Sequence, residues 1–66
     1  MDKWYKLTAT SKTGLIKQLQ TTYIIAGNKG FEVLSTKLYN LSQDAIFDDY
    51  LTVKQIKAKA LAILER

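Results

Sequence analysis

Apolar and polar residues alternate through much of the first forty positions, in three segments separated by two short clusters of turn-forming residues. The clusters are SKTG at 11–14 and GNKG at 27–30, whose glycine and asparagine tolerate the positive φ of a hairpin turn. The segments themselves are rich in β-branched and aromatic residues, which favour strands. The pattern predicts a three-stranded antiparallel meander, with strands at about 3–10, 15–26 and 31–39.

Residues 14–22 are also compatible with a helix. Four apolar side chains there follow the spacing of one helical face: Leu15, Ile16, Leu19 and Tyr23. The run QTTYII favours a strand instead, because β-branched side chains lose rotamer freedom in a helix. We therefore expect a strand, with the helix as the alternative.

The register of the predicted meander can be tested by parity, because a shift of one residue exchanges the two faces of a strand. Pairing Ser11 with Leu15 and Ala26 with Phe31 gives one apolar face and one polar face in both hairpins. The polar face would gather aromatic, basic and amide side chains: Trp4, Lys6, Gln18, Gln20, Thr22, Ser35, Lys37 and Tyr39. The agreement of the two hairpins supports the meander.

Two segments after residue 40, LSQDAI and LTVKQI, have the residues that commonly begin a helix. Ser42 and Thr52 suit the N-cap position, where a hydroxyl accepts a hydrogen bond from a first-turn amide. Gln55 would complete a capping box with Thr52. We expect a short helix at about 43–49 and a longer one at about 53–65, which makes the fold class α+β.

The longer predicted helix is amphipathic. One side collects apolar residues: Val53, Ile56, Ala60, Ile63 and Leu64. The opposite side holds Lys54, Lys59 and two alanines, so we expect a helix that covers the core and turns its lysines to water.

Two resemblances to nucleic-acid-binding families arise at these residues. KQIKAKAL is similar to part of the final helix of double-stranded-RNA-binding domains, and the two predicted helices resemble a helix-turn-helix in outline. The chain has no room for the first helix of the former family. The linking DDYL places two aspartates where a helix-turn-helix would meet phosphates. No functional residue carries over from either family.

The composition describes a small globular domain: 66 residues, 47% hydrophobic, with a net charge of +4. The chain has no Cys and no His, which excludes disulfides and the usual transition-metal ligands. We expect one domain that gains stability by association, as a homodimer or with another protein. No apolar stretch approaches the ~20 residues that span a bilayer, so we expect a cytoplasmic protein.

Few side chains suited to catalysis are present. Asp44 and Asp48 lie four residues apart and could share a cation such as Mg²⁺. The simpler interpretation is that Asp44 stabilises a helix N-terminus by its charge. We expect no enzyme activity, no cofactor and no bound metal.

The predicted polar face is the preferred binding surface. We expect it to bind another protein, because tryptophan and tyrosine dominate protein interfaces. The predicted partner-binding residues are Trp4, Lys6, Phe31, Lys37 and Tyr39. A further apolar patch, expected to be covered by a partner, contains Ile24, Ala26, Phe31 and Val33.

Nucleic-acid binding without sequence preference is the alternative function. Lysines interleaved with aromatic rings can neutralise phosphates while the rings stack on bases. The predicted contacts are Lys6, Lys17, Lys37, Lys54 and Lys59. Residues 1–40 carry the whole basic excess, since four basic and four acidic residues balance in 41–66.

Overall fold

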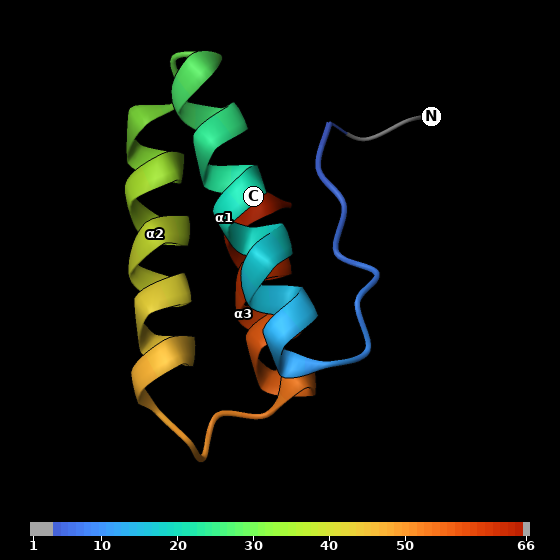
Figure 1. Ribbon diagram of the computed structural model, residues 1–66. Helices are drawn as coiled ribbons and strands as arrows, with labels where there is room; N and C mark the ends of the chain where they lie inside the picture. The colour runs from blue at the N-terminus through green and yellow to red at the C-terminus, as the bar shows by residue number, and fades with distance from the viewer. Residues whose placement is uncertain (1–3, 66) are drawn as a thin grey trace.

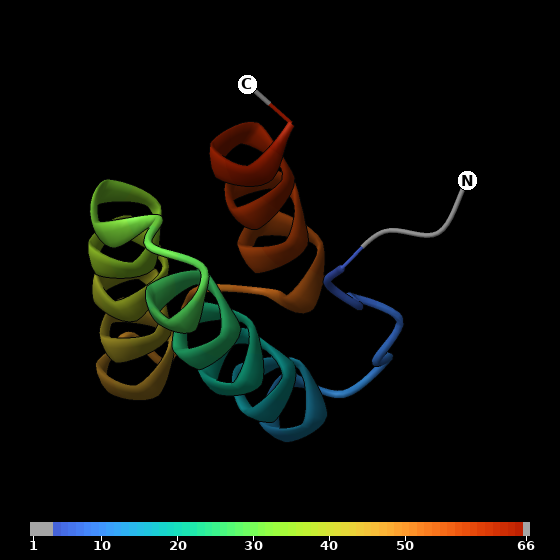
Figure 2. The same cartoon turned by 90° about the horizontal axis from the view of Figure 1, so that it is seen from above.

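The computed structural model describes residues 4–65, which form three helices joined by short turns. The helices are α1 (Lys12–Asn28), α2 (Glu32–Phe47) and α3 (Val53–Leu64). Helices α1 and α2 make a close antiparallel pair, and α3 packs behind them in the same direction as α1 (Figure 1). Seen from above, α3 stands apart from this pair, and the extended segment 4–10 runs along the open side between α1 and α3 (Figure 2).

The predicted meander is wrong, because the described residues contain no strand. Residues 15–26 belong to α1. Residues 32–39 are the start of α2, and Phe31 is its N-cap. Residues 4–10 are extended without pairing to a neighbouring strand, and Lys3, the first residue of the predicted first strand, lies outside the described residues. The fold class is therefore all-α, and the α+β assignment is corrected.

The helical alternative for residues 14–22 is confirmed. Leu15, Leu19, Thr22 and Ala26 are buried, and their spacing of four, three and four residues places them on one face of α1. The hydroxyl of Thr22 donates a hydrogen bond of 2.6 Å to the carbonyl of Gln18. The polar group of Thr22 therefore has a hydrogen-bond partner inside the helix. The helix propensity of a β-branched residue is lower than that of alanine by only tenths of a kcal/mol.

Both predicted hairpin turns are helix ends. In SKTG, Ser11 is the N-cap of α1, and its hydroxyl accepts a 3.1 Å hydrogen bond from the amide of Gly14. In GNKG, Gly30 has a φ of 85° and follows the end of α1. The Phe31 amide donates to the Ala26 carbonyl at 2.8 Å, and the Gly30 amide donates to the Gly27 carbonyl at 3.1 Å. These two bonds form a Schellman motif, which closes a helix through a left-handed glycine.

The predicted separate short helix at 43–49 is also wrong, since residues 43–47 are the end of α2 and residues 48 and 49 lie in the turn that follows. Ser42 lies in the helix interior, is fully buried and donates a 2.6 Å hydrogen bond to the Tyr39 carbonyl. Helix α2 begins eleven residues earlier than predicted because the chain turns sharply at Gly30 and then continues as helix. A serine hydroxyl that could cap a helix can also lie inside one, where it donates a hydrogen bond to the carbonyl of a preceding residue.

The prediction for the last helix is confirmed, with an end one residue earlier. Thr52 accepts a 3.2 Å hydrogen bond from the Gln55 amide, and the Gln55 side chain accepts a 3.0 Å bond from the Thr52 amide. The predicted apolar side faces the core, where Ile56 and Ala60 are fully buried. Lys54 and Lys59 are exposed, as expected.

The core gathers side chains from all three helices: Leu15, Leu19, Leu38, Leu41, Ala45, Ile56 and Ala60. Segment 4–10 adds Leu7 and Ala9 at its edge. The Gln18 side-chain oxygen accepts hydrogen bonds of 3.0 and 2.9 Å from the amides of Thr8 and Ala9, and its nitrogen donates to the Thr8 hydroxyl at 3.2 Å. One side chain of α1 therefore holds the extended segment in place.

Candidate protein-binding surface

An open apolar pocket of about 460 Å³ lies at the end of the bundle where α1 passes into α2. We call it the Trp4–Phe31 pocket. Its lining comes from segment 4–10, the α1–α2 turn, the start of α2 and the end of α3: Trp4, Gly30, Phe31, Glu32, Val33, Leu34 and Leu64. Glu32 carries the only charge among these residues.

The two rings of the pocket come from separate parts of the chain. Their centroids are 6.0 Å apart with planes tilted by 57°, and the ring of Tyr5 packs edge-on against Trp4 at 5.4 Å. Phe31 is placed by the Schellman motif. Trp4 is placed by segment 4–10. Gln18 binds this segment at residues 8 and 9, and the Tyr5 hydroxyl donates a 2.6 Å hydrogen bond to the Glu65 carboxylate.

The walls of this pocket are unusually exposed for apolar side chains. Val33 is 71% exposed and Phe31 is 46% exposed, and both lie at the start of α2. An isolated exposed valine is ordinary, but a phenylalanine, a valine and a tryptophan around one hollow form a patch. The arrangement can accept an apolar side chain of a ligand, since pockets of ~300–1,000 Å³ with mainly apolar walls are typical binding sites.

The predicted partner-binding residues do not form one surface. Trp4 and Phe31 come together in the pocket. Lys6 lies in segment 4–10 beside α1, Lys37 lines a groove between α2 and α3, and Tyr39 packs edge-on against Tyr23 with ring centroids 5.4 Å apart. The grouping was derived from strand pairing, which the helices replace.

The predicted apolar patch is partly corrected. Ala26 is fully buried in the α1–α2 interface, whereas Ile24, Phe31 and Val33 are exposed. The prediction missed Leu34 and Leu64, which line the pocket from the two helix ends that meet there. No signal within a few residues of Leu64 could show this, because the pocket exists only once the third helix has packed.

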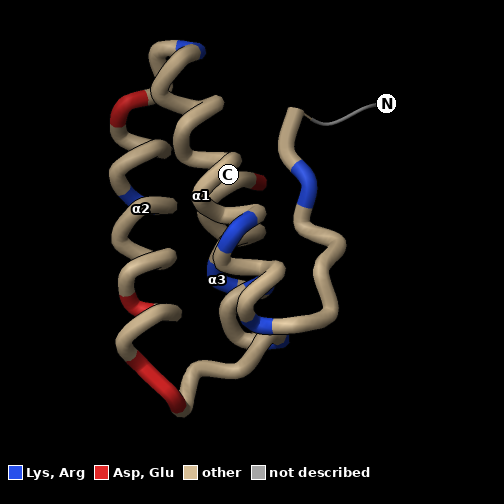
Figure 3. Tube along the Cα trace, in the orientation of Figure 1, with Lys and Arg blue, Asp and Glu red and all other residues tan. Residues whose placement is uncertain are grey.

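The lysines predicted to contact nucleic acid are distributed over the extended segment and all three helices. Lys37 and Lys59 do approach each other across the groove between α2 and α3, but Asp44 lines the same groove. Acidic residues predominate along α2 and the turn that follows it, and lysines along α1 and α3 (Figure 3). The structure thus gives a charge asymmetry across the molecule, with lysines along α1 and α3 and acidic residues along α2.

The two aspartates that the sequence suggested as a cation pair, Asp44 and Asp48, lie in the last turn of α2 and directly after it. Within residues 4–65 there is no group of three or more acidic, His or Cys side chains that could hold a metal ion. Asp44 lies in the last turns of α2, so the expectation that its charge favours a helix N-terminus is wrong. The helix dipole there disfavours an anion.

Comparison with protein-family models, with curated proteins and with solved structures finds no match for the chain. Within the part of the chain that the structure describes, no helix has the length and apolar character needed to cross a bilayer.

Proposed function

We propose that this protein is a small non-enzymatic binding domain that holds an apolar side chain of a partner protein in the Trp4–Phe31 pocket. The observation that carries the proposal is the pairing of the two rings around an open apolar hollow, with Val33 standing exposed at its edge. Aromatic anchors in concave, mostly apolar sites are typical centres of protein interfaces.

Charge favours a protein ligand over nucleic acid at this pocket. Glu32 lies on the pocket wall, and a carboxylate there would repel phosphates. Lys6, one of the predicted nucleic-acid contacts, lines a smaller hollow against α1 that shares only Trp4 with the pocket. An uncharged or basic peptide carrying a leucine or an aromatic residue suits the pocket.

The test uses peptides selected for binding from a displayed random library, followed by titration of the purified protein with the tightest peptide. Trp4 fluorescence reports binding, because it is the only tryptophan in the chain. Val33→Asp should weaken binding about tenfold or more, since each factor of ten corresponds to ~1.4 kcal/mol and the substitution places a charge in an apolar contact.

The matched control is Ile24→Asp, which introduces the same charge at another exposed apolar residue, on α1 and outside the pocket. This variant should bind the peptide as the original protein does. Equal loss in both variants, or a gel shift with single-stranded DNA at low salt in place of peptide binding, would contradict the proposal.

A further inference from the structure

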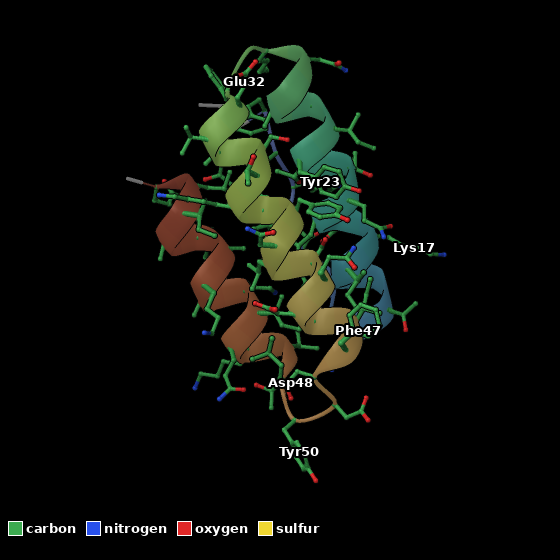
Figure 4. The ribbon with its side chains drawn as sticks, turned by 90° about the vertical axis from the view of Figure 1, so that its left-hand side faces the viewer. Lys17, Tyr23, Glu32, Phe47, Asp48 and Tyr50 are labelled. Carbon is green, nitrogen blue, oxygen red and sulfur yellow. The ribbon has the colours of Figure 1, made fainter. Side chains whose placement is uncertain are left out.

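The turn between α2 and α3 carries two aromatic side chains outside the core. We call residues Phe47–Tyr50 the FDDY turn. Phe47 is 79% exposed and Tyr50 is 93% exposed, more than any other large apolar or aromatic residue described. Tyr50 projects from the end of the bundle, away from the three helices (Figure 4).

Hydrogen bonds hold this turn in one shape. The Tyr50 amide donates to the Asp48 carboxylate at 3.0 Å, and the Leu51 amide donates to the Asp48 carbonyl at 3.2 Å. The Lys12 ammonium, at the start of α1, donates to the same carbonyl at 2.7 Å. The two rings are therefore presented on a preorganised turn, which lowers the entropy cost of binding through them.

A second hollow lies at the same end of the molecule, where α3 begins. We call it the α3 groove: an open, largely apolar hollow of about 540 Å³ between the extended segment and α3, lined by Thr10, Val53, Lys54, Lys57, Ala58 and Leu61. It is larger than the Trp4–Phe31 pocket. An apolar cavity of ~150 Å³ already accepts a benzene ring, so the groove has room for an aromatic side chain.

The turn and the groove are complementary in charge, and both are partly apolar. The turn offers two rings with Asp48 and Asp49 between them, and the groove offers an apolar floor with Lys54 and Lys57 on its wall. Lys12 lies close to the turn, where its ammonium is bound to the backbone of Asp48. No residue of the FDDY turn lines the α3 groove of its own chain, so a turn that occupies the groove comes from a second copy.

The geometry points to a second copy of this chain as the ligand of the α3 groove, bound through its FDDY turn. Both surfaces lie at the end of the bundle where α2 stops and α3 starts. One two-fold axis at that end brings each turn to the groove of the other copy, which closes the assembly as a dimer. The Trp4–Phe31 pocket lies at the opposite end and stays open in this dimer.

The association is tested by sedimentation equilibrium of the purified protein from about 10 μM to 1 mM at low salt. The expected mass rises from that of the 7.5 kDa chain to twice that value, and the transition moves to higher concentration with added salt because the charge pairs are screened. Tyr50→Ser should weaken the dimer about tenfold or more, as expected for an aromatic anchor at an interface.

Reversing one charge in the FDDY turn and one in the α3 groove tests whether these two surfaces meet in the dimer. Asp49→Lys and Lys54→Glu should each weaken self-association about tenfold or more, because each places like charges in contact twice per dimer. An equimolar mixture of the two variants should associate as tightly as the original protein, since each turn then meets a groove of opposite charge. Both sites are exposed, so neither change disturbs the core.

The matched controls are Glu32→Lys and Lys17→Glu, which make the same changes in net charge at exposed sites away from the turn and groove. They should leave the dimer unchanged. A protein that stays monomeric at 1 mM, a dimer unaffected by Tyr50→Ser, or a mixture of the charge variants that fails to associate would each overturn the inference. Tight binding of some other acidic protein to the groove of a monomeric chain would overturn it too.

Discussion

Gly30 shows how one residue can end a helix and direct the next. Its φ of 85° lies in the left-handed region, where a side chain would crowd the following carbonyl. The requirement for a positive φ was correctly inferred from the GNKG cluster, but it belongs to a Schellman motif and not to a hairpin. Glycine in a sequence indicates a positive φ, and both a hairpin turn and a Schellman motif require one.

Gly30→Ala should therefore lower the free energy of unfolding by about 1 kcal/mol through backbone strain alone, since an added Cβ there meets no atom within 4 Å. Gly27→Ala is the control, because Gly27 is inside α1 and an added Cβ would meet the Ser35 hydroxyl oxygen at an ordinary 3.6 Å. It should stabilise by up to ~1 kcal/mol through helix propensity. Urea unfolding followed by circular dichroism measures both, and a similar change in the two variants would refute the assignment of strain to Gly30.

At the scale of elements, α3 was predictable and α2 was not. Helix α3 begins at a complete capping box and has a regular apolar stripe, so every signal for it lies within its own residues. Helix α2 has Phe31 at its N-cap position without a side-chain cap, and its capping-type serine, Ser42, lies buried in its interior. Local signals therefore predicted a start eleven residues too late.

Thr52→Ala should lower the free energy of unfolding by about 1 kcal/mol, because it leaves the Gln55 amide without its acceptor. Thr13→Ala serves as the control, since Thr13 is exposed in the first turn of α1 and alanine favours helix there. Thermal or urea unfolding compares the two variants. If Thr52→Ala were as stable as the control, the capping box would not contribute to stability.

At the scale of the molecule, the extended segment completes a bundle that three helices leave open. It lies between α1 and α3, carries Leu7 and Ala9 to the edge of the core and places Trp4 beside Phe31. A chain this short buries only about 60% of its unfolded surface, so such a segment contributes a sizeable part of the stability. The Trp4–Phe31 pocket depends on this extended segment as well, because the segment carries Trp4.

Gln18→Ala should release this segment, because three hydrogen bonds from one side chain hold residues 8 and 9. We expect a loss of about 1–2 kcal/mol in unfolding free energy and a shift of Trp4 fluorescence to longer wavelength as the ring becomes hydrated. Gln20→Ala, two residues further along α1, should change neither. Unchanged fluorescence in Gln18→Ala would show that Trp4 is held by its ring contacts alone.

The sequence by itself determined the features that depend on neighbouring residues: the start of α3 at Thr52, its apolar face and the positive φ near residue 30. Only the tertiary structure decided whether residues 15–39 are strand or helix. Their β-branched residues favour strand by tenths of a kcal/mol each, whereas full burial of side chains such as Leu15, Leu19 and Leu38 contributes ~1.5–3 kcal/mol each. That burial requires helices α2 and α3 to be present, and the pocket of Trp4 and Phe31 arises from the same packing.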